Sequence, residues 1–194
     1  FGEDDFRAWA ESDSVGGSPG GPDPVTADPL ASVCINEWQN HSDPEDWIEL
    51  YNHSNASVDL SGAWLSDDPT TNKWRIPNNT FISARGFQSW YQGQLGFELF
   101  AGGETMFFVN SNQTRVIDVI DFRGQSNNLS SGRSPDGGPI QYGLANTTKG
   151  NPNSRPMHYP VVITEIMYNP ISGNLDDEYL EFHNRSSAPV DISG

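Results

Sequence analysis

The chain contains a single cysteine, Cys34, among its 194 residues. One thiol excludes an intrachain disulfide and a cysteine-based metal site. Cys34 falls in an apolar stretch, where a thiol usually behaves as a small buried hydrophobe, and we expect this state. Attachment of a lipid at Cys34 would need a preceding apolar run, but the residues before Leu30 are acidic and rich in Gly and Pro.

Basic residues are scarce: 10 Lys and Arg stand against 26 Asp and Glu, which gives a formal net charge of −16. A surface this acidic repels phosphate backbones, so we expect no nucleic-acid partner. No apolar window approaches the roughly 20 residues that span a membrane, so no membrane insertion is expected either. This composition suits a secreted or cell-surface protein, which is the predicted location.

The motifs of common enzymes are also missing. The four histidines have neither HxxxH nor HExxH spacing, so no zinc site is expected. No Ser–His–Asp set can be assembled from the spacing, and the Gly-rich segments lack the lysine that a phosphate-binding loop needs. We therefore predict that the chain is not an enzyme and has no catalytic or cofactor-binding residues.

The chain does contain short segments in which apolar residues recur with a period of two. Residues 33–38 and 47–52 alternate in this way and are separated by Asn, Ser, Asp and Pro, so we expect a hairpin. Residues 105–110 and 115–122 form the clearest second hairpin. In the first strand, alternation places on one face Cys34, Asn36 and Trp38, and on the other Val33, Ile35 and Glu37.

About eight or nine such strands, separated by frequent turns, predict an all-β fold. No strand is followed by a helical segment of the length that a βαβ unit needs. We expect an antiparallel β-sandwich over residues 31–153. Residues 1–30 are predicted to form a short helix and a Gly/Pro-rich linker, and residues 154–160 a second linker.

An internal repeat gives a second boundary. Residues 47–62 recur without gaps as residues 179–194, and residues 35–38 recur as residues 163–166. We therefore expect a second domain to begin near Val161, with only its first strands in residues 161–194. Because a few strands cannot enclose a hydrophobic core, this segment is expected to be disordered, to pair with another chain, or to belong to a longer protein.

Seven short segments follow one another along the chain before a closing Thr148 and Gly150–Asn153. They are INEW, DWIELYN, VDLSGAWLSDD, KWRIP, GETMFFVN, VIDVIDF and GRSPDGG. In this order and spacing, residues 31–153 resemble the lamin tail domain family, and residues 162–194 resemble the start of a second, truncated copy. The resemblance implies an immunoglobulin-like sandwich, and a non-catalytic binding or structural module of the bacterial secreted or surface type. Residues 87–93 depart from the family's usual aliphatic strand.

A pair of glutamates is the most specific candidate for chemistry. Glu37 and Glu49 are expected to face each other in the first hairpin, and Glu165 and Glu181 repeat the pair. Two carboxylates can perform acid–base chemistry or hold a cation. Because the pair recurs in a non-enzymatic repeat, we expect a structural role, such as hydrogen bonds to a neighbouring loop.

Three weaker groups of candidates remain. Acidic loops could bind Ca²⁺, although solvated loops are the default. Exposed aromatic side chains could contact a protein or carbohydrate partner, although core packing explains most tryptophans. Asn-x-Ser/Thr triplets would be glycosylated in a eukaryotic secretory protein but arise by composition in a bacterial one. The calcium candidates are Asp43, Glu45, Asp46, Asp67, Asp68, Asp176, Asp177 and Glu178; the partner-binding candidates are Trp38, Trp90 and Tyr91; the triplets begin at Asn40, Asn52, Asn55, Asn78, Asn112, Asn128, Asn146 and Asn184.

Two functions from different classes fit these observations. The first is an extracellular module for adhesion, surface assembly or protein–protein interaction, with a protein partner or self-assembly through residues 161–194. The second is an accessory segment of a larger secreted hydrolase or nuclease whose catalytic domain lies outside these residues.

Overall fold

The computed structural model describes residues 19–21 and 28–193. The chain divides into two units, one that ends at Pro156 and one that begins at Met157, and each is described by itself. The predicted helix and most of the predicted linker in residues 1–30 lie outside the described residues. No helix in the described part of the chain is long and apolar enough to cross a membrane.

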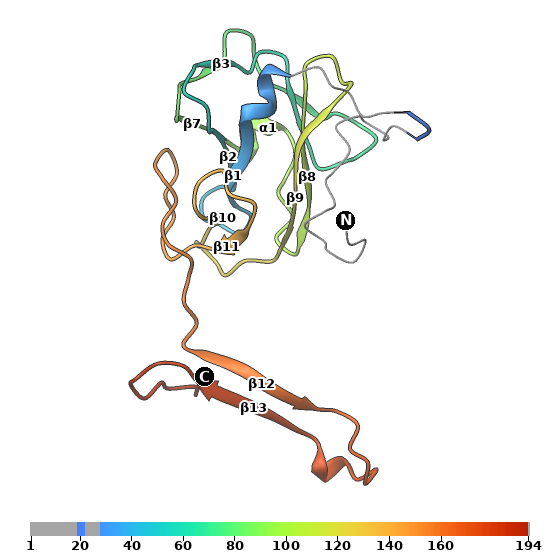
Figure 1. Cartoon of the computed structure of the whole chain (residues 1–194), viewed down its shortest axis with the longest axis vertical. Helices are drawn as coiled ribbons and strands as arrows, with labels where there is room; N and C mark the ends of the chain where they lie inside the picture. Colours follow the sequence, from blue (N-terminus) through green and yellow to red (C-terminus); the bar gives the residue numbers. More distant parts are fainter. Residues whose placement is uncertain (1–18, 22–27, 194) are drawn as a thin grey trace. The chain divides into compact units, whose positions relative to one another are not determined.

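The first unit consists almost entirely of antiparallel strands (Figure 1). Five of them form a sheet in the order β11-β10-β1-β2-β7, four form a sheet in the order β5-β4-β8-β9, and β3 pairs with β6. The elements are the 3-10 helix η2 (Pro29–Ser32), β1 (Val33–Gln39), β2 (Trp47–Asn52), β3 (Val58–Asp59), β4 (Trp64–Ser66), β5 (Trp74–Arg75), β6 (Phe81–Ile82), β7 (Phe87–Tyr91), α1 (Gln92–Leu95), β8 (Gly103–Val109), β9 (Val116–Arg123), β10 (Ser131–Arg133) and β11 (Gln141–Gly143).

The two larger sheets pack face to face around one hydrophobic core. Ile48 from β2 and Phe108 from β8 are both fully buried in it. The rings of Trp38 in β1 and Phe122 in β9 lie 5.7 Å apart between centroids and so connect the sheets. Side chains from two inner faces that share one core define a sandwich, so the predicted immunoglobulin-like antiparallel β-sandwich is confirmed.

A β-bulge in β1 changes which side chains reach this core. β1 pairs with β2 in regular register except between Ile35 and Glu37, where Asn36 is an extra residue. The bulge turns Ile35 and Trp38 to the same face, and both enter the core. The predicted faces, with Trp38 beside Asn36 and opposite Ile35, are therefore wrong for this strand.

Residues 87–93, which depart from the family pattern, divide into an edge strand and a one-turn helix. Among the described residues β7 pairs only with β2, and the chain then turns into α1 directly after Tyr91. Trp90 supplies the core contact of β7 and lies 5.3 Å from the ring of Trp74 between centroids. The aromatic residue thus does the packing that an aliphatic strand would otherwise do.

The second unit is a hairpin of β12 (Val161–Met167) and β13 (Tyr179–Asn184), and its loop contains the 3-10 helix η3 (Leu175–Asp177). Figure 1 shows the two strands side by side in orange and red. Their pairing repeats that of β1 and β2 residue by residue, including a bulge between Ile163 and Glu165. The repeat found in the sequence therefore extends to the strand register.

Candidate functional site

The outer face of the β1–β2 hairpin carries the predicted glutamate pair. Glu37 and Glu49 are paired across the two strands, as expected from the sequence. Both side chains are fully buried, although they point away from the hydrophobic core. The residues that bond to them belong chiefly to the segment after β11, from Thr148 to Asn153, which we call the cover loop.

Hydrogen bonds explain how the glutamates hold the cover loop. Glu37 Oε1 accepts from the Ser130 hydroxyl at 2.6 Å and from the Thr148 amide at 2.9 Å, while its Oε2 accepts from the Thr148 hydroxyl at 2.8 Å. Glu49 Oε2 accepts from the Gly150 amide at 2.5 Å. Glu49 Oε1 is buried and receives no hydrogen bond from any residue that the structure describes.

Burial controls the protonation of the pair. It raises the pKa of Glu37 above the ordinary value, and hydrogen bonds from Ser130 and Thr148 oppose this shift. The pKa of Glu49 rises further, from 4.5 to about 8, because burial is opposed mainly by one amide and the Glu37 carboxylate adds repulsion. Glu49 is therefore expected to be mostly protonated at neutral pH, whereas Glu37 receives more hydrogen bonds.

A second set of bonds fixes the end of the cover loop. Asn153 donates from its side-chain amide to the Asn36 carbonyl oxygen at 3.0 Å and to that of Arg133 at 2.8 Å. Asp136 accepts from the Asn36 side chain and from the Asn153 backbone amide, both at 2.9 Å. The bulge residue Asn36 thus binds the loop that covers the strand from which it protrudes.

Lys149, which belongs to the cover loop, lies over the aromatic rings of Tyr91 and Trp47. Its ammonium nitrogen lies 3.4 Å from the centroid of the Tyr91 ring and 5.7 Å from that of Trp47. A cation over an aromatic face is attractive by roughly 0.5–1 kcal/mol at exposed sites. The cover loop thus forms a layer over the glutamates and bonds to both of them, which agrees with the structural role predicted for the pair.

Gly132 in β10 provides a test of this layer. A Cβ at this position would lie 2.6 Å from both the Asn36 carbonyl oxygen and the Asn153 side-chain nitrogen. We expect Gly132→Ala to lower the free energy of unfolding by about 1–3 kcal/mol in a urea titration, because backbone and loop must both shift. Gly21→Ala, where a Cβ meets nothing within 4 Å, is the control, and equal stability of the two variants would contradict this account.

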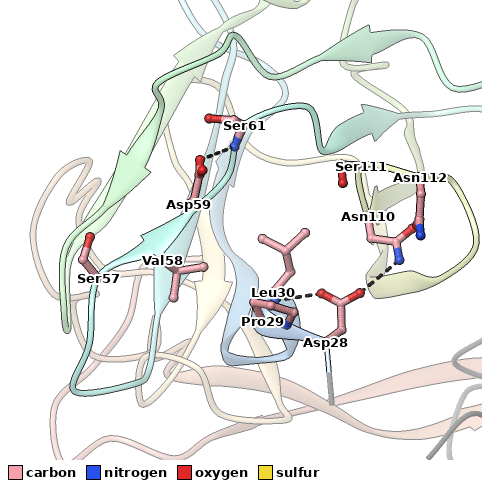
Figure 2. A pocket seen from close by; sticks show the side chains of 10 residues that line it. All are labelled: Asp28, Pro29, Leu30, Ser57, Val58, Asp59, Ser61, Asn110, Ser111 and Asn112. Atoms are coloured by element: carbon pink, nitrogen blue, oxygen red, sulfur yellow. Dashed lines mark hydrogen bonds between the residues drawn. The ribbon is translucent and has the colours of Figure 1, made fainter. Parts of the chain in front are cut away.

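A cleft of about 450 Å³ lies elsewhere on the first unit, where η2, the β3 turn and the β8–β9 loop converge (Figure 2). Asp28 is fixed there by the Leu30 amide at 2.9 Å and the Asn110 side chain at 3.0 Å, and Asp59 accepts from the Ser61 amide at 2.9 Å. Hydroxyl, amide and carboxylate groups line the cleft and could bond to a carbohydrate. Its lining includes no aromatic side chain for a sugar ring, so carbohydrate binding stays a prediction.

The structure corrects two of the predicted partner-binding residues. Trp38 and Trp90 are 1% and 5% exposed and belong to the core, so they cannot form a surface platform. Tyr91 is 41% exposed, but Lys149 lies over its ring. Cys34 is buried as predicted, and burial raises the pKa of its thiol to about 12.

Several of the calcium candidates bond to local partners. Asp46 accepts from the Ser42 amide and hydroxyl, Asp67 pairs with Lys73 at 2.6 Å, and Glu45 accepts from the Gly93 amide. Among residues 19–21 and 28–193, no three His, Cys, Asp or Glu side chains form a group that could hold a metal ion. The remaining candidates, Asp43, Asp68, Asp176, Asp177 and Glu178, lie in loops or in and beside η3.

The glycosylation triplets fall into two groups. Asn40 and Asn52 are fully buried, and their side-chain amides donate to backbone carbonyl oxygens, so the folded chain cannot carry a glycan at either. The prediction is wrong for these two positions. The exposed positions are Asn55, Asn78, Asn112, Asn128, Asn146 and Asn184.

Sequence reasoning missed a buried ion pair between Asp118 in β9 and Arg133 in β10. Arg133 Nη2 lies 2.9 Å from Asp118 Oδ1, and its Nε donates to the Ile35 carbonyl oxygen at 2.8 Å. Asp118 in turn accepts from the Ile35 amide at 2.7 Å. The only signal was that Asp118 is one of two acids in the otherwise apolar run of β9, and its partner could not be identified from spacing.

The comparisons with known proteins agree with this architecture. No curated protein matches the chain. The family model for the Lamin Tail Domain matches residues 26–148, which include every strand of the sandwich. Most of the chain is therefore matched over the sheets, the bulged hairpin and the beginning of the cover loop, and the protein belongs to the lamin tail domain family.

Proposed function

We propose that the chain is a non-catalytic binding and structural module of a secreted or cell-surface protein, and that the β12–β13 hairpin is its interaction element. One observation carries this proposal. Ile163, Ile166, Leu180 and Phe182 occupy the positions of four core residues in the first hairpin, yet they are 53–58% exposed. We call these four side chains the hairpin face.

The match between the two hairpins includes the turn that follows each of them. Asn52 donates from its side chain to the Ala56 carbonyl oxygen at 2.7 Å, and Asn184 donates to that of Ala188 at 2.8 Å. A hairpin that repeats register, bulge and turn supports the proposal that residues 161–194 open a second lamin-tail-like unit. In the first unit the corresponding hairpin, β1–β2, packs against the opposite sheet in the hydrophobic core.

The extracellular part of the proposal is supported by surface chemistry. The net charge of −16 keeps the molecule soluble through self-repulsion. The one cysteine is buried, so the folded surface carries no thiol within the described residues. Six exposed triplets could accept glycans if the source is eukaryotic.

A dye that binds exposed apolar surface tests whether the hairpin face is available. We expect anilinonaphthalene sulfonate to fluoresce with the full chain at low protein concentration, and the signal to fall by about half or more in Ile166→Thr/Phe182→Thr, since threonine removes apolar surface but keeps strand propensity. Val162→Thr, on the opposite face of β12, is the matched control. No dye signal from the full chain, or an unchanged signal in the double variant, would refute the proposed interaction element.

A further inference from the structure

β7 leaves an unpaired backbone edge on the five-stranded sheet of the first unit. It is the last strand in the order β11-β10-β1-β2-β7, and it is labelled at the margin of this unit in Figure 1. The Asn52 amide donates to the Gly86 carbonyl oxygen at 3.0 Å, just before the first residue pair of β2 and β7. Because hydrogen-bonded pairs alternate along an antiparallel ladder, Phe87, Ser89 and Tyr91 turn their backbone amide and carbonyl groups away from β2.

Few of these outward backbone groups have a partner. The Tyr91 amide donates to the Gln94 side chain at 3.1 Å, and the Ser89 carbonyl oxygen accepts from the Gln88 side chain at 3.4 Å. The amides of Phe87 and Ser89 donate to no residue that the structure describes. An edge of this kind is a template on which another strand can pair.

The other edges of the two larger sheets are protected against such pairing. β9 carries Asp118, Asp121 and Arg123 and has an irregular register with β8, while β5 has two residues and β11 three. Charged side chains, bulges and short strands are the means by which proteins keep sheet edges from pairing. β7 has five residues in regular register with β2, and none of residues 86–97 is charged.

The side chains of β7 can face a second copy of themselves. Phe87, Ser89 and Tyr91 lie on one face of the strand, because they are two residues apart. With the small Ser89 on the two-fold axis of an antiparallel pair, Phe87 of each copy lies across from Tyr91 of the other. Cross-strand aromatic pairs of this kind stabilise a sheet by roughly 0.2–1 kcal/mol each. In this register the two Ser89 residues exchange backbone bonds, and each Phe87 amide donates to a Tyr91 carbonyl oxygen.

The charges at the two ends of β7 favour the same antiparallel arrangement. Arg85 is exposed and precedes the strand, while Glu45 accepts from the Gly93 amide at 2.6 Å just after the strand. In an antiparallel pair the start of one strand meets the end of the other, so Arg85 of each copy approaches Glu45 of the other. A second copy therefore offers complementary charge at both ends of an uncharged edge.

We propose that two copies of this chain associate by antiparallel pairing of their β7 edges, so that the five-stranded sheets of both copies join into one continuous sheet. The two-fold axis makes the interface isologous and closed, since each copy uses its β7 edge once. This inference concerns the first unit alone and goes beyond the proposed function. It does not depend on the hairpin face, so the dye experiment above leaves it unchanged.

Hydrogen exchange of the β7 amides tests this pairing, together with sedimentation equilibrium of the full chain over a range of concentrations. The amides of Gln88 and Trp90 bond to β2 and should be protected at every concentration. The amides of Phe87 and Ser89 should gain about tenfold or more in protection once the dimer is the main species. This alternation within one strand is specific to pairing at the β7 edge.

Proline at position 89 removes the central bonds of the dimer but leaves the β2–β7 ladder intact, because the Ser89 amide points to the open edge. We expect Ser89→Pro to raise the dissociation constant roughly tenfold or more, whereas Ser89→Ala keeps the amide and should change it about twofold or less. Arg85→Glu should raise it about threefold or more, and Arg123→Glu, the same change at an exposed position in β9, should not. Retained protection of the Gln88 amide shows that a variant still forms β7.

The outcomes are distinct. A dimer that protects the Phe87 and Ser89 amides and that Ser89→Pro weakens supports the inference. A monomer at every concentration overturns it and leaves the β7 edge to a strand of a different protein. A dimer in which the Ser89 amide stays unprotected also overturns it, because the two copies then meet at another surface. A dimer that Ser89→Pro and Arg85→Glu leave intact contradicts the proposed pairing in the same way.

Discussion

Replacing Arg133 with methionine is expected to lower the free energy of unfolding by about 3–5 kcal/mol at neutral pH. Arg133 is 8% exposed and donates to the carbonyl oxygens of Ile35 and Gly138 and to the carboxylate of Asp118. Methionine fills much of the same volume but leaves the Asp118 charge without a partner. A largely buried carboxylate left without its partner, together with two carbonyl oxygens that each lose a hydrogen bond, accounts for the size of the loss.

The position of Arg133 explains why this residue matters more than other basic side chains. Ile35 is the last regularly paired residue before the bulge in β1, and its amide and carbonyl groups bond to Asp118 and Arg133. The ion pair therefore completes the backbone bonding that the bulge interrupts. It also links β9 of one sheet to β10 of the other, so its loss affects both layers of the sandwich.

Urea unfolding at neutral pH measures the effect. Arg123→Met, at an exposed position in β9, is the control and should change stability by about 0.5 kcal/mol or less. Arg133→Met/Asp118→Asn should recover part of the loss, because asparagine removes the buried charge but keeps an acceptor for the Ile35 amide. A loss below about 1 kcal/mol in Arg133→Met, or no recovery in the double variant, would contradict this account.

The sandwich could be predicted from the sequence because the signals that indicate this fold are local. Alternation, turn residues and the repeat are all properties of neighbouring positions, and they placed Glu37 opposite Glu49 correctly. The repeat also supported a structural role for this pair, since the same two positions carry glutamates in residues 161–194. The role then depends on hydrogen bonds to Thr148 and Gly150, about a hundred residues away, which alternation cannot reveal.

The bulge shows where this reasoning failed and what signal was present. One extra residue in a strand reverses the faces of everything after it, and no amino-acid type marks its position. The spacing nevertheless contained a hint, because large apolar residues stand three apart in both copies, Ile35 with Trp38 and Ile163 with Ile166. Two core residues at an odd spacing fit a strand only if a bulge lies between them.

Glu49→Gln is expected to change how stability depends on pH. The unfolded chain has a Glu49 pKa near 4.5, and burial raises the folded value to about 8. Because the folded pKa is the higher one, the folded state holds the proton more tightly, and stability is fully present below pH 4.5 and lost as pH rises through 8. This difference corresponds to about 4–5 kcal/mol, an order-of-magnitude figure, between the two ends of that range.

Glutamine imitates the protonated side chain at every pH, because its carbonyl oxygen can accept the Gly150 amide bond that Glu49 Oε2 receives. The charged groups that act on Glu49 are Glu37, Asp136 and Lys149, and all three remain in the variant. The free energy of unfolding of Glu49→Gln minus that of the natural chain should therefore be small near pH 5, grow in favour of the variant up to about pH 8, and level off above it. Subtracting the two curves cancels the titration of the other groups, because the substitution leaves their surroundings unchanged.

Chemical unfolding of both proteins at intervals between pH 5 and 9 gives this difference directly. Glu98→Gln, at an exposed position outside the strands, should show no such trend. A difference that stays constant with pH would mean that Glu49 is already ionised beneath the cover loop at neutral pH, and that hydrogen bonding outweighs burial. A growing difference would show that the cover loop is held most firmly while Glu49 is neutral, because the protein then retains a buried pair with at most one negative charge.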